Sequence, residues 1–144
     1  MLDMKIKQLF FDTAKVKRAV DSARRRVLSK AGAFIRRRAK SSIRKRKATS
    51  APGQPPSSHT GILKRFIYFG YEPSTDSVVI GPVRLQKLGD APSALEHGGK
   101  TVVRRRKGRK FVKKKTKIKS RPFMEPALVA ERKNLPELWR NSVR

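Results

Sequence analysis

The chain has 144 residues and a formal net charge of +28, from 38 Lys and Arg against 10 Asp and Glu. Cysteine is absent, which excludes disulfide frameworks and thiolate metal sites. The apolar share of 37% is below the usual share for globular chains, so we expect one domain with a modest core and much of the chain outside it. Charge of one sign opposes compact folding unless an anion neutralises it, and nucleic acid is the commonest such partner.

An anionic membrane surface is the second partner that this charge would suit. The sequence contains no apolar run as long as a membrane span, and its first residues show neither a signal peptide nor a myristoylation site. We therefore expect no membrane association.

Apolar residues recur every three to four positions from Asp12 to about Lys47, which predicts one long N-terminal helix over residues 12–47. Asp12 or Thr13 is placed to cap its start, and Gly32 is its one weak point. The other faces of this helix are strongly basic. The apolar positions are Val16, Val20, Ala23, Val27, Ala31, Phe34 or Ile35, Ala39 and Ile43.

Residues 48–60 are rich in Pro, Gly and Ser and predict a loop, after which residues 61–99 are expected to contain the sheet. Strand-type side chains run from Ile62 to Tyr71, with a short helical entry at 61–64. A turn at 73–76 and a returning strand at 77–81 complete an antiparallel hairpin. Residues 94–99 predict a short helical turn closed by glycine.

The segment 100–120 is the most basic part of the chain, and no acidic residue interrupts it. Apolar residues among its cations predict a second hairpin or a flexible arm, with a turn at Lys107–Gly108. Cations contact phosphates through charge alone, so this signal is specific for a polyanion and not for a base sequence. The alternative is a solvated loop or a targeting run. The cations expected to face DNA or an acidic partner are Arg104, Arg105, Arg106, Lys107, Arg109, Lys110, Lys113, Lys114 and Lys115.

Residues 121–144 predict a C-terminal helix that begins near Glu125, has Pro126 in its first turn and is broken or kinked at Pro136. Phe66, Tyr68, Phe69 and Trp139 are expected in the core or at a subunit interface. Phe111 is the single aromatic residue inside the basic segment, which argues against a single-strand binder that stacks bases. The apolar face of the helix is predicted to contain Ala127, Leu128, Ala130, Leu135, Leu138 and Trp139.

A catalytic set is difficult to assemble from this sequence. His59 and His97 have no convincing carboxylate partner nearby in the sequence, and Ser57 and Ser58 would need an unseen base to act as nucleophiles. Metal-ligand spacing is also missing. We therefore expect no enzyme activity, no metal and no cofactor, and an enzyme with a polyanionic substrate is the least favoured alternative.

Three short motifs follow one another along the chain. A Pro/Gly loop leads into Thr60-Gly61-Ile62-Leu63, the stretch 94–98 follows the first hairpin, and Arg121-Pro122-Phe123 leads into the last helix. In this order, over about residues 12–143, they resemble the tail-completion, or head–tail joining, family of long-tailed bacteriophages. The chain departs from that family at His97, where an aromatic is commoner, and in the basicity of residues 100–119. The family-matched positions are Pro52, Gly61, Leu63, Leu95, Glu96, Gly98, Arg121, Pro122, Phe123 and Pro126.

The resemblance implies an α+β fold in which the long helix packs on a small antiparallel sheet, followed by the basic hairpin or arm and the C-terminal helix. It implies a non-enzymatic virion protein that forms a homo-oligomeric ring, commonly six-fold, in the neck between capsid and tail. The ring would surround the DNA channel, touch other neck and tail proteins and contact DNA without base preference. Before assembly the chain would lie in the host cytoplasm.

Two alternatives to this reading stay open. Within phages, the chain would instead be a tail terminator or a minor tail protein. Outside phages, composition alone favours a basic nucleic-acid-binding protein of the ribosomal or nucleoid type. In the family-matched set, Phe123 is expected to anchor the last helix, either to its own sheet or to an adjacent subunit.

Overall fold

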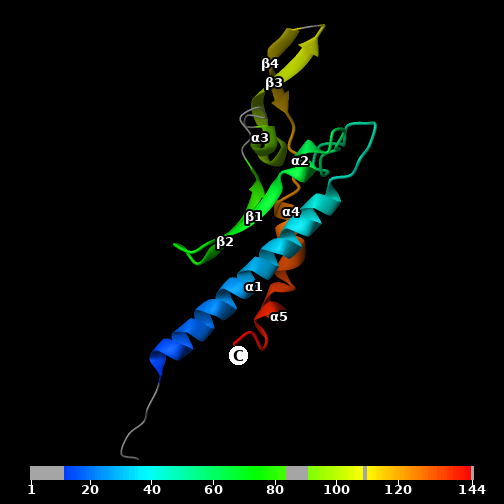
Figure 1. Ribbon diagram of the computed structural model, residues 1–144. Coiled ribbons are helices and arrows are strands. Elements are labelled where there is room, and N and C mark those ends of the chain that lie inside the picture. Colours follow the sequence, from blue (N-terminus) through cyan, green and yellow to red (C-terminus); the bar gives the residue numbers. More distant parts are fainter. Residues whose placement is uncertain (1–11, 84–90, 109, 144) are drawn as a thin grey trace, which may run out of the picture.

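The computed structural model of the chain describes residues 12–83, 91–108 and 110–143, and it confirms an α+β fold. The long helix α1 lies between the hairpin β1–β2 and the C-terminal helices, and the hairpin β3–β4 projects from one end (Figure 1). The elements in chain order are α1 (Thr13–Ser42), α2 (Ile62–Arg65), β1 (Ile67–Glu72), β2 (Ser77–Pro82), α3 (Ala91–His97), β3 (Gly99–Lys107), β4 (Lys110–Ile118), α4 (Glu125–Arg132) and α5 (Leu135–Trp139).

Helix α1 begins as the sequence predicts but ends earlier. The carboxylate of Asp12 accepts a hydrogen bond from the backbone N–H of Lys15 at 2.9 Å, which is an N-cap. The prediction that the helix reaches Lys47 is wrong, because Ile43 adopts an extended backbone conformation and is buried in the core with 1% of its surface exposed. The hydroxyl of Ser42 also bonds back to the carbonyl of Ala39 at 2.8 Å. The cations at 44–47 therefore follow the helix and do not belong to it.

The apolar stripe of α1 is buried only from Ala23 onward. Val16 and Val20 belong to the same predicted stripe, but their side chains are 43% and 37% exposed. Figure 1 shows the start of α1 extending past β1 and β2. The buried positions of α1 are Ala23, Val27, Ala31, Gly32, Ile35 and Ala39.

The hairpin β1–β2 lies against α1, with Ile67 of β1 paired to Pro82 and Glu72 paired to Ser77. The short helical entry is present as α2, so the strand begins at Ile67 and not at Ile62. Gly32 of α1 makes the closest approach: a Cβ atom built there would lie 2.7 Å from Val78 Cγ2 and 2.8 Å from Phe69 Cδ2. The residue that looked like a weak point in the helix is therefore a packing contact with the sheet.

The core joins three parts of the chain that are far apart in sequence. Phe123 is 1% exposed and packs in one cluster with Ile43 of the first loop and Ile67 of β1. The expectation that Phe123 anchors the last helix is confirmed, and the anchor is its own chain. The buried members of the cluster are Ile35, Ala39, Ile43, Ile67, Phe123 and Ala127.

The C-terminal segment forms two short helices and not one long helix. The chain leaves α4 after Arg132, and Pro136 sits in the first turn of α5, where a missing N–H costs nothing. Much of the predicted apolar face stays outside the core, since Leu128 and Trp139 are both 47% exposed.

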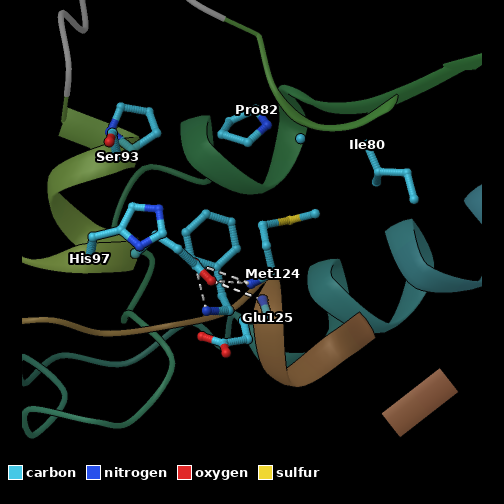
Figure 2. Close-up of a pocket in the computed structure, with 10 residues that line it drawn as sticks. Ile80, Pro82, Ser93, His97, Met124 and Glu125 are labelled. Atoms are coloured by element: carbon cyan, nitrogen blue, oxygen red, sulfur yellow. Dashed lines mark hydrogen bonds between the residues drawn. The ribbon is translucent and has the colours of Figure 1, made fainter. Parts of the chain in front are cut away.

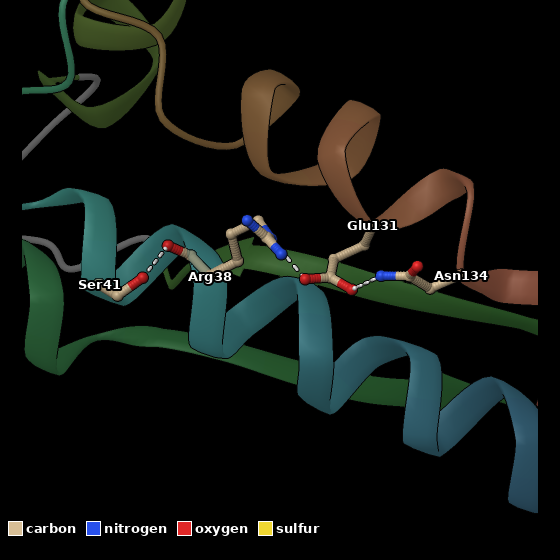
Figure 3. Close-up of polar contacts among 4 residues, drawn as sticks. All are labelled: Arg38, Ser41, Glu131 and Asn134. Atoms are coloured by element: carbon tan, nitrogen blue, oxygen red, sulfur yellow. Dashed lines mark hydrogen bonds and ion pairs between the residues drawn. The ribbon is translucent and has the colours of Figure 1, made fainter.

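An ion pair between exposed Arg38 and buried Glu131 holds α4 to α1. Arg38 donates from Nε to the carboxylate of Glu131, which also accepts from the Asn134 amide at 3.1 Å (Figure 3). Glu131 is only 8% exposed, so these partners satisfy a charge that would otherwise be costly to bury. The hydrogen bond from Arg38, followed by that from Asn134, lowers the pKa of Glu131 from its ordinary value.

Candidate nucleic-acid interface

The basic segment forms a regular antiparallel hairpin. Gly99 pairs with Ile118 at its base and Lys107 pairs with Lys110 near its tip, and Gly108 in the turn has a φ of +62°. The predicted turn at Lys107–Gly108 is therefore confirmed, and the alternative of an unstructured arm is not what the structure shows. Figure 1 shows this hairpin extending away from α1 and from the β1–β2 sheet.

The two faces of the hairpin differ, because successive residues of a strand point to opposite sides. On the face that we call the lysine face, every described side chain is exposed. On the opposite face, which we call the threonine face, Thr101 is 7% exposed and Thr116 and Ile118 are half-buried, close to where α3 contacts β3. The lysine face contains Lys100, Val102, Phe111, Lys113, Lys115 and Lys117, and the threonine face contains Thr101, Val103, Lys110, Val112, Lys114, Thr116 and Ile118.

The predicted cations do not form one surface. Lys113 and Lys115 lie on the lysine face, whereas Lys110 and Lys114 lie on the threonine face, and all four are exposed. The backbone of 104–107 belongs to β3, but the side chains of Arg104, Arg105, Arg106 and Lys107, and the whole of Arg109, lie outside the described residues.

Two further lysines belong with this site although the sequence did not single them out. Lys100 and Lys117 pair directly across the ladder, on the same face as Lys113 and Lys115. The alternation of side chains along a strand was the signal that could have found them.

The base of the hairpin is held by Glu96, the last residue but one of α3. Its carboxylate accepts hydrogen bonds from the backbone N–H groups of Phe123 at 2.9 Å, Met124 at 3.1 Å and Glu125 at 2.8 Å (Figure 2). Such N–H groups at the start of a helix have no partner within it, and a negative charge there also complements the helix dipole. The stretch 94–98 and the segment Arg121-Pro122-Phe123 therefore form one structural unit. Glu96 of the stretch 94–98 caps α4, the helix that follows Phe123.

Backbone contacts tie the same region to the Pro/Gly loop. Arg121 donates from its backbone N–H to the carbonyl of Leu95 at 2.6 Å, and from its side-chain Nε to the carbonyl of Ser50 at 2.9 Å. Gly98 has a φ of +78°, and a Cβ atom there would lie 3.2 Å from the backbone N of Ser120. Glycine is therefore favoured at this position for two reasons: the positive φ angle disfavours a side chain, and a Cβ atom would lie close to the backbone of Ser120. We call the set Leu95, Glu96, Gly98, Ser120, Arg121 and Phe123 the junction.

The remaining family-matched positions serve the loop and the helices. Gly61 has a φ of +74° at the start of α2, and its N–H donates to the hydroxyl of Ser58 at 2.9 Å. Leu63 packs against the core, and Pro126 stands in the first turn of α4. Pro52 is exposed in the loop, next to Gly53, whose N–H donates to the carbonyl of Ser120 at 2.9 Å.

A pocket of about 500 Å³ lies beside the junction, between β2, α3 and the start of α4. Its described lining is largely apolar, and the carboxylate of Glu96 that reaches it already accepts the three N–H groups that cap α4. His97 is exposed at its edge. The arrangement therefore supports packing and capping; the described lining offers no nucleophile–base pair at hydrogen-bonding distance.

The other candidates for chemistry have local roles. Ser58 accepts a hydrogen bond within its loop, and His59 is exposed close to Lys45. Within 12–83, 91–108 and 110–143, no three His, Asp or Glu residues gather as metal ligands would. In the same ranges no helix combines the length and the apolar character that crossing a membrane requires.

Comparison with protein-family models, with curated proteins and with solved structures gives no match. The resemblance to head–tail joining proteins therefore rests on the order of its short motifs. The contacts among these motifs are a separate observation, made in three dimensions: residues 50–53, 95–98 and 120–125 meet at the base of the basic hairpin.

Proposed function

We propose that this chain is a non-catalytic structural protein of an assembly that encloses nucleic acid, and that its basic hairpin contacts the phosphate backbone. The observation that carries the proposal is the hairpin itself: it projects from the body, and no Asp or Glu occurs between His97 and Met124. The motif order makes the neck of a tailed bacteriophage the assembly that we favour. There the chain would join capsid to tail as one subunit of a ring, as a tail-completion protein.

A channel for DNA requires contacts that hold the duplex centrally without gripping a sequence. Lysines on an extended hairpin provide such contacts, because phosphates carry no sequence information and their neutralisation depends on salt and not on base identity. No Asn, Gln, Asp or Glu lies on the hairpin, so the side chains that typically read adenine or cytosine edges are absent from its sequence.

The junction supports a structural and not a chemical role for the motif residues. Glu96 uses its carboxylate to cap α4, and Arg121 uses its guanidinium to hold the loop carbonyl of Ser50. Both groups thereby fix the direction in which the hairpin leaves the body. A hairpin with a fixed direction is what a subunit needs if equivalent hairpins are to converge on one channel.

The proposal is tested with the purified full chain by electron microscopy and by DNA binding at increasing salt. We expect rings that persist at high salt after nucleic acid has been removed, and an affinity for duplex DNA that falls steeply with salt and is the same for unrelated sequences. Antibody labelling of virions is expected at the neck. Labelling along or at the far end of the tail would favour a minor tail or terminator protein.

A ribosomal or nucleoid-type protein is the second candidate, because an extended basic hairpin on a small body would also suit the interior of a folded RNA. The basic surface of α1 favours it as well, since Arg25, Arg26 and Arg37 are exposed on it. Monomers that carry stoichiometric RNA, released only at high salt, would support this candidate and contradict the ring.

A further inference from the structure

We infer that the hairpin binds the phosphate backbone with its lysine face and not with its threonine face. The inference rests on the proposed function, since it assumes that nucleic acid is the partner, and it names the surface that makes the contact. Three features of the structure favour this face: the spacing of its lysines, the covering of the opposite face, and the pairing of like charges across the ladder.

The first feature is a row of cations along β4. Lys113, Lys115 and Lys117 occupy alternate positions of the strand and are all exposed on the lysine face. Alternate residues of an antiparallel strand are about 6.8 Å apart. The row therefore places three positive charges over about 14 Å of extended strand, beside a duplex that carries one negative charge per roughly 1.7 Å of axis.

The second feature is the asymmetry of burial. Near the base of the hairpin the threonine face is occupied by the body, where Thr101 is 7% exposed and Ile118 is half-buried. Beyond this covered base, the threonine face is exposed along β4 at Lys110, Val112 and Lys114. The lysine face is open from Lys100 at the base to Phe111 near the tip.

The third feature is the register. Lys100 faces Lys117 directly across the ladder, and both side chains are exposed on the lysine face. Like charges directly opposite each other destabilise a sheet. On the threonine face, the paired positions whose side chains the structure describes bring no two cations together, since Thr101 faces Thr116 and Val103 faces Lys114. A phosphate backbone on the lysine face would therefore relieve repulsion that the hairpin cannot relieve with its own residues, since it contains no acid.

The test compares two variants of the full chain that lose the same charge from the same strand. Lys113→Gln/Lys115→Gln alters the lysine face, and Lys110→Gln/Lys114→Gln alters the threonine face; all four side chains are exposed, so both proteins are expected to fold. Binding to a mixed-sequence DNA duplex is measured across a salt series. The lysine-face variant is expected to bind roughly tenfold or more weakly. Its plot of log affinity against log salt concentration should be shallower by about 1.8, which corresponds to two lost phosphate contacts. The threonine-face variant is expected to lose less than half as much.

Equal losses in the two variants would overturn the choice of face while leaving nucleic-acid binding intact. No binding of the unaltered chain to duplex DNA or duplex RNA would instead contradict the proposed function, so the two failures are distinguishable. Duplex RNA in parallel separates the two sources of a phosphate backbone. Binding to polyglutamate that is as tight, and as dependent on Lys113 and Lys115, would overturn nucleic acid in favour of an acidic protein.

Hydrogen exchange supplies a second measurement that does not depend on the variants. Saturating duplex DNA is expected to slow amide exchange in both β3 and β4, because the bound phosphates remove the repulsion across the lysine face. Unchanged exchange throughout the hairpin at saturation would contradict the inference.

Discussion

The chain contains two hairpins of opposite character. From Phe66 to Val83, the part that forms β1 and β2, there is no Lys or Arg and there are two acids, Glu72 and Asp76. From His97 to Met124, the part that forms β3 and β4, there is no acid. The first hairpin lies against α1, whereas the second extends away from the body (Figure 1).

The difference shows how one small core supports two kinds of strand pair. An isolated two-stranded hairpin is at best marginally stable in water. The hairpin β1–β2 gains stability by packing Ile67 into the core and Phe69 against α1. The hairpin β3–β4 contacts the body at its base, through α3 and the junction, and the side chains of Lys110 to Lys115 farther along β4 are exposed. We expect the first hairpin to respond to changes in packing and the second to changes in charge.

The largest effect is expected from Phe123→Ala, because this residue links the core that holds β1 to the junction that holds the second hairpin. It is 1% exposed, and truncation of a buried Phe typically costs about 3–5 kcal/mol. Urea unfolding should show that loss, with faster amide exchange in both hairpins. Phe111→Ala is the matched control: Phe111 is 63% exposed, so we expect a change within about 0.5 kcal/mol. Similar losses in the two variants would mean that Phe123 is not a core anchor.

A smaller effect, confined to one hairpin, is expected from Glu96→Gln. The amide keeps one acceptor oxygen but loses the charge that receives the N–H groups of Phe123, Met124 and Glu125. Hydrogen bonds to charged groups contribute about 1.5–3 kcal/mol, and we expect a loss in the lower part of that range. Exchange should quicken in the first turn of α4 and at the base of β3 and β4, while β1–β2 stays protected.

Glu125→Gln is the control for Glu96, since Glu125 is exposed in the first turn of the same helix and loses only its interaction with the helix dipole. A loss from Glu125→Gln as large as that from Glu96→Gln would mean that charge near the helix start matters more than the cap.

Much of this architecture could be predicted from local patterns. The cap at Asp12 and the hairpin turn at Lys107–Gly108 follow from residue types and spacing, and the structure confirms both. The anchoring role of Phe123 is expected from its place in a family-matched motif, and its burial confirms it. Two features could not be obtained in this way. The end of α1 depends on Ile43 leaving the helix to enter the core, and the exposure of Val16 depends on where the strands stop covering the helix. Both are tertiary effects that override a local periodicity.

The sequence predicts which residues are basic at the candidate site, but it does not predict which of them share a face. The run of cations predicts a polyanion partner, yet only the pairing register separates Lys113 and Lys115 from Lys110 and Lys114. The junction depends on contacts between residues 96 and 123–125, and nothing in the local sequence around Glu96 shows which helix its carboxylate will cap.

Packing between α1 and the first hairpin is tested by Gly32→Ala. The added methyl would lie within 3 Å of Val78 and Phe69, side chains that hold the sheet against the helix. Overpacking typically costs about 1–3 kcal/mol, against a gain of about 1 kcal/mol in helix propensity, so we expect a net loss near 1 kcal/mol. Gly70→Ala in β1 is the control, because nothing lies within 4 Å of its Cβ position, and it should be neutral or stabilising. Stabilisation by Gly32→Ala would show that the contact is loose.

The smallest effect concerns the second hairpin and has the opposite sign. Lys117→Glu replaces a like-charge pair with Lys100 by an attractive one, and such cross-strand pairs contribute about 0.2–1 kcal/mol. The free energy of opening of the β3 and β4 amides should rise by that amount, which slows their exchange. The global unfolding midpoint should change little, because the hairpin lies outside the core. Lys119→Glu is the control: it makes the same change in net charge at an exposed position just past the end of β4, where it has no partner across the ladder.

If both variants slow exchange equally, the gain comes from the lower net charge of the whole protein and not from the pair. If Lys117→Glu alone slows exchange, the hairpin of the unaltered chain carries a repulsion that its own fold leaves in place. Such a hairpin would be held below its attainable stability by the same lysines that we propose for the phosphate contact. Lys117→Glu should then weaken DNA binding while it stabilises the free protein. A fluorescence titration against duplex DNA, run beside the exchange measurement, determines whether the DNA affinity falls while the hairpin stability rises.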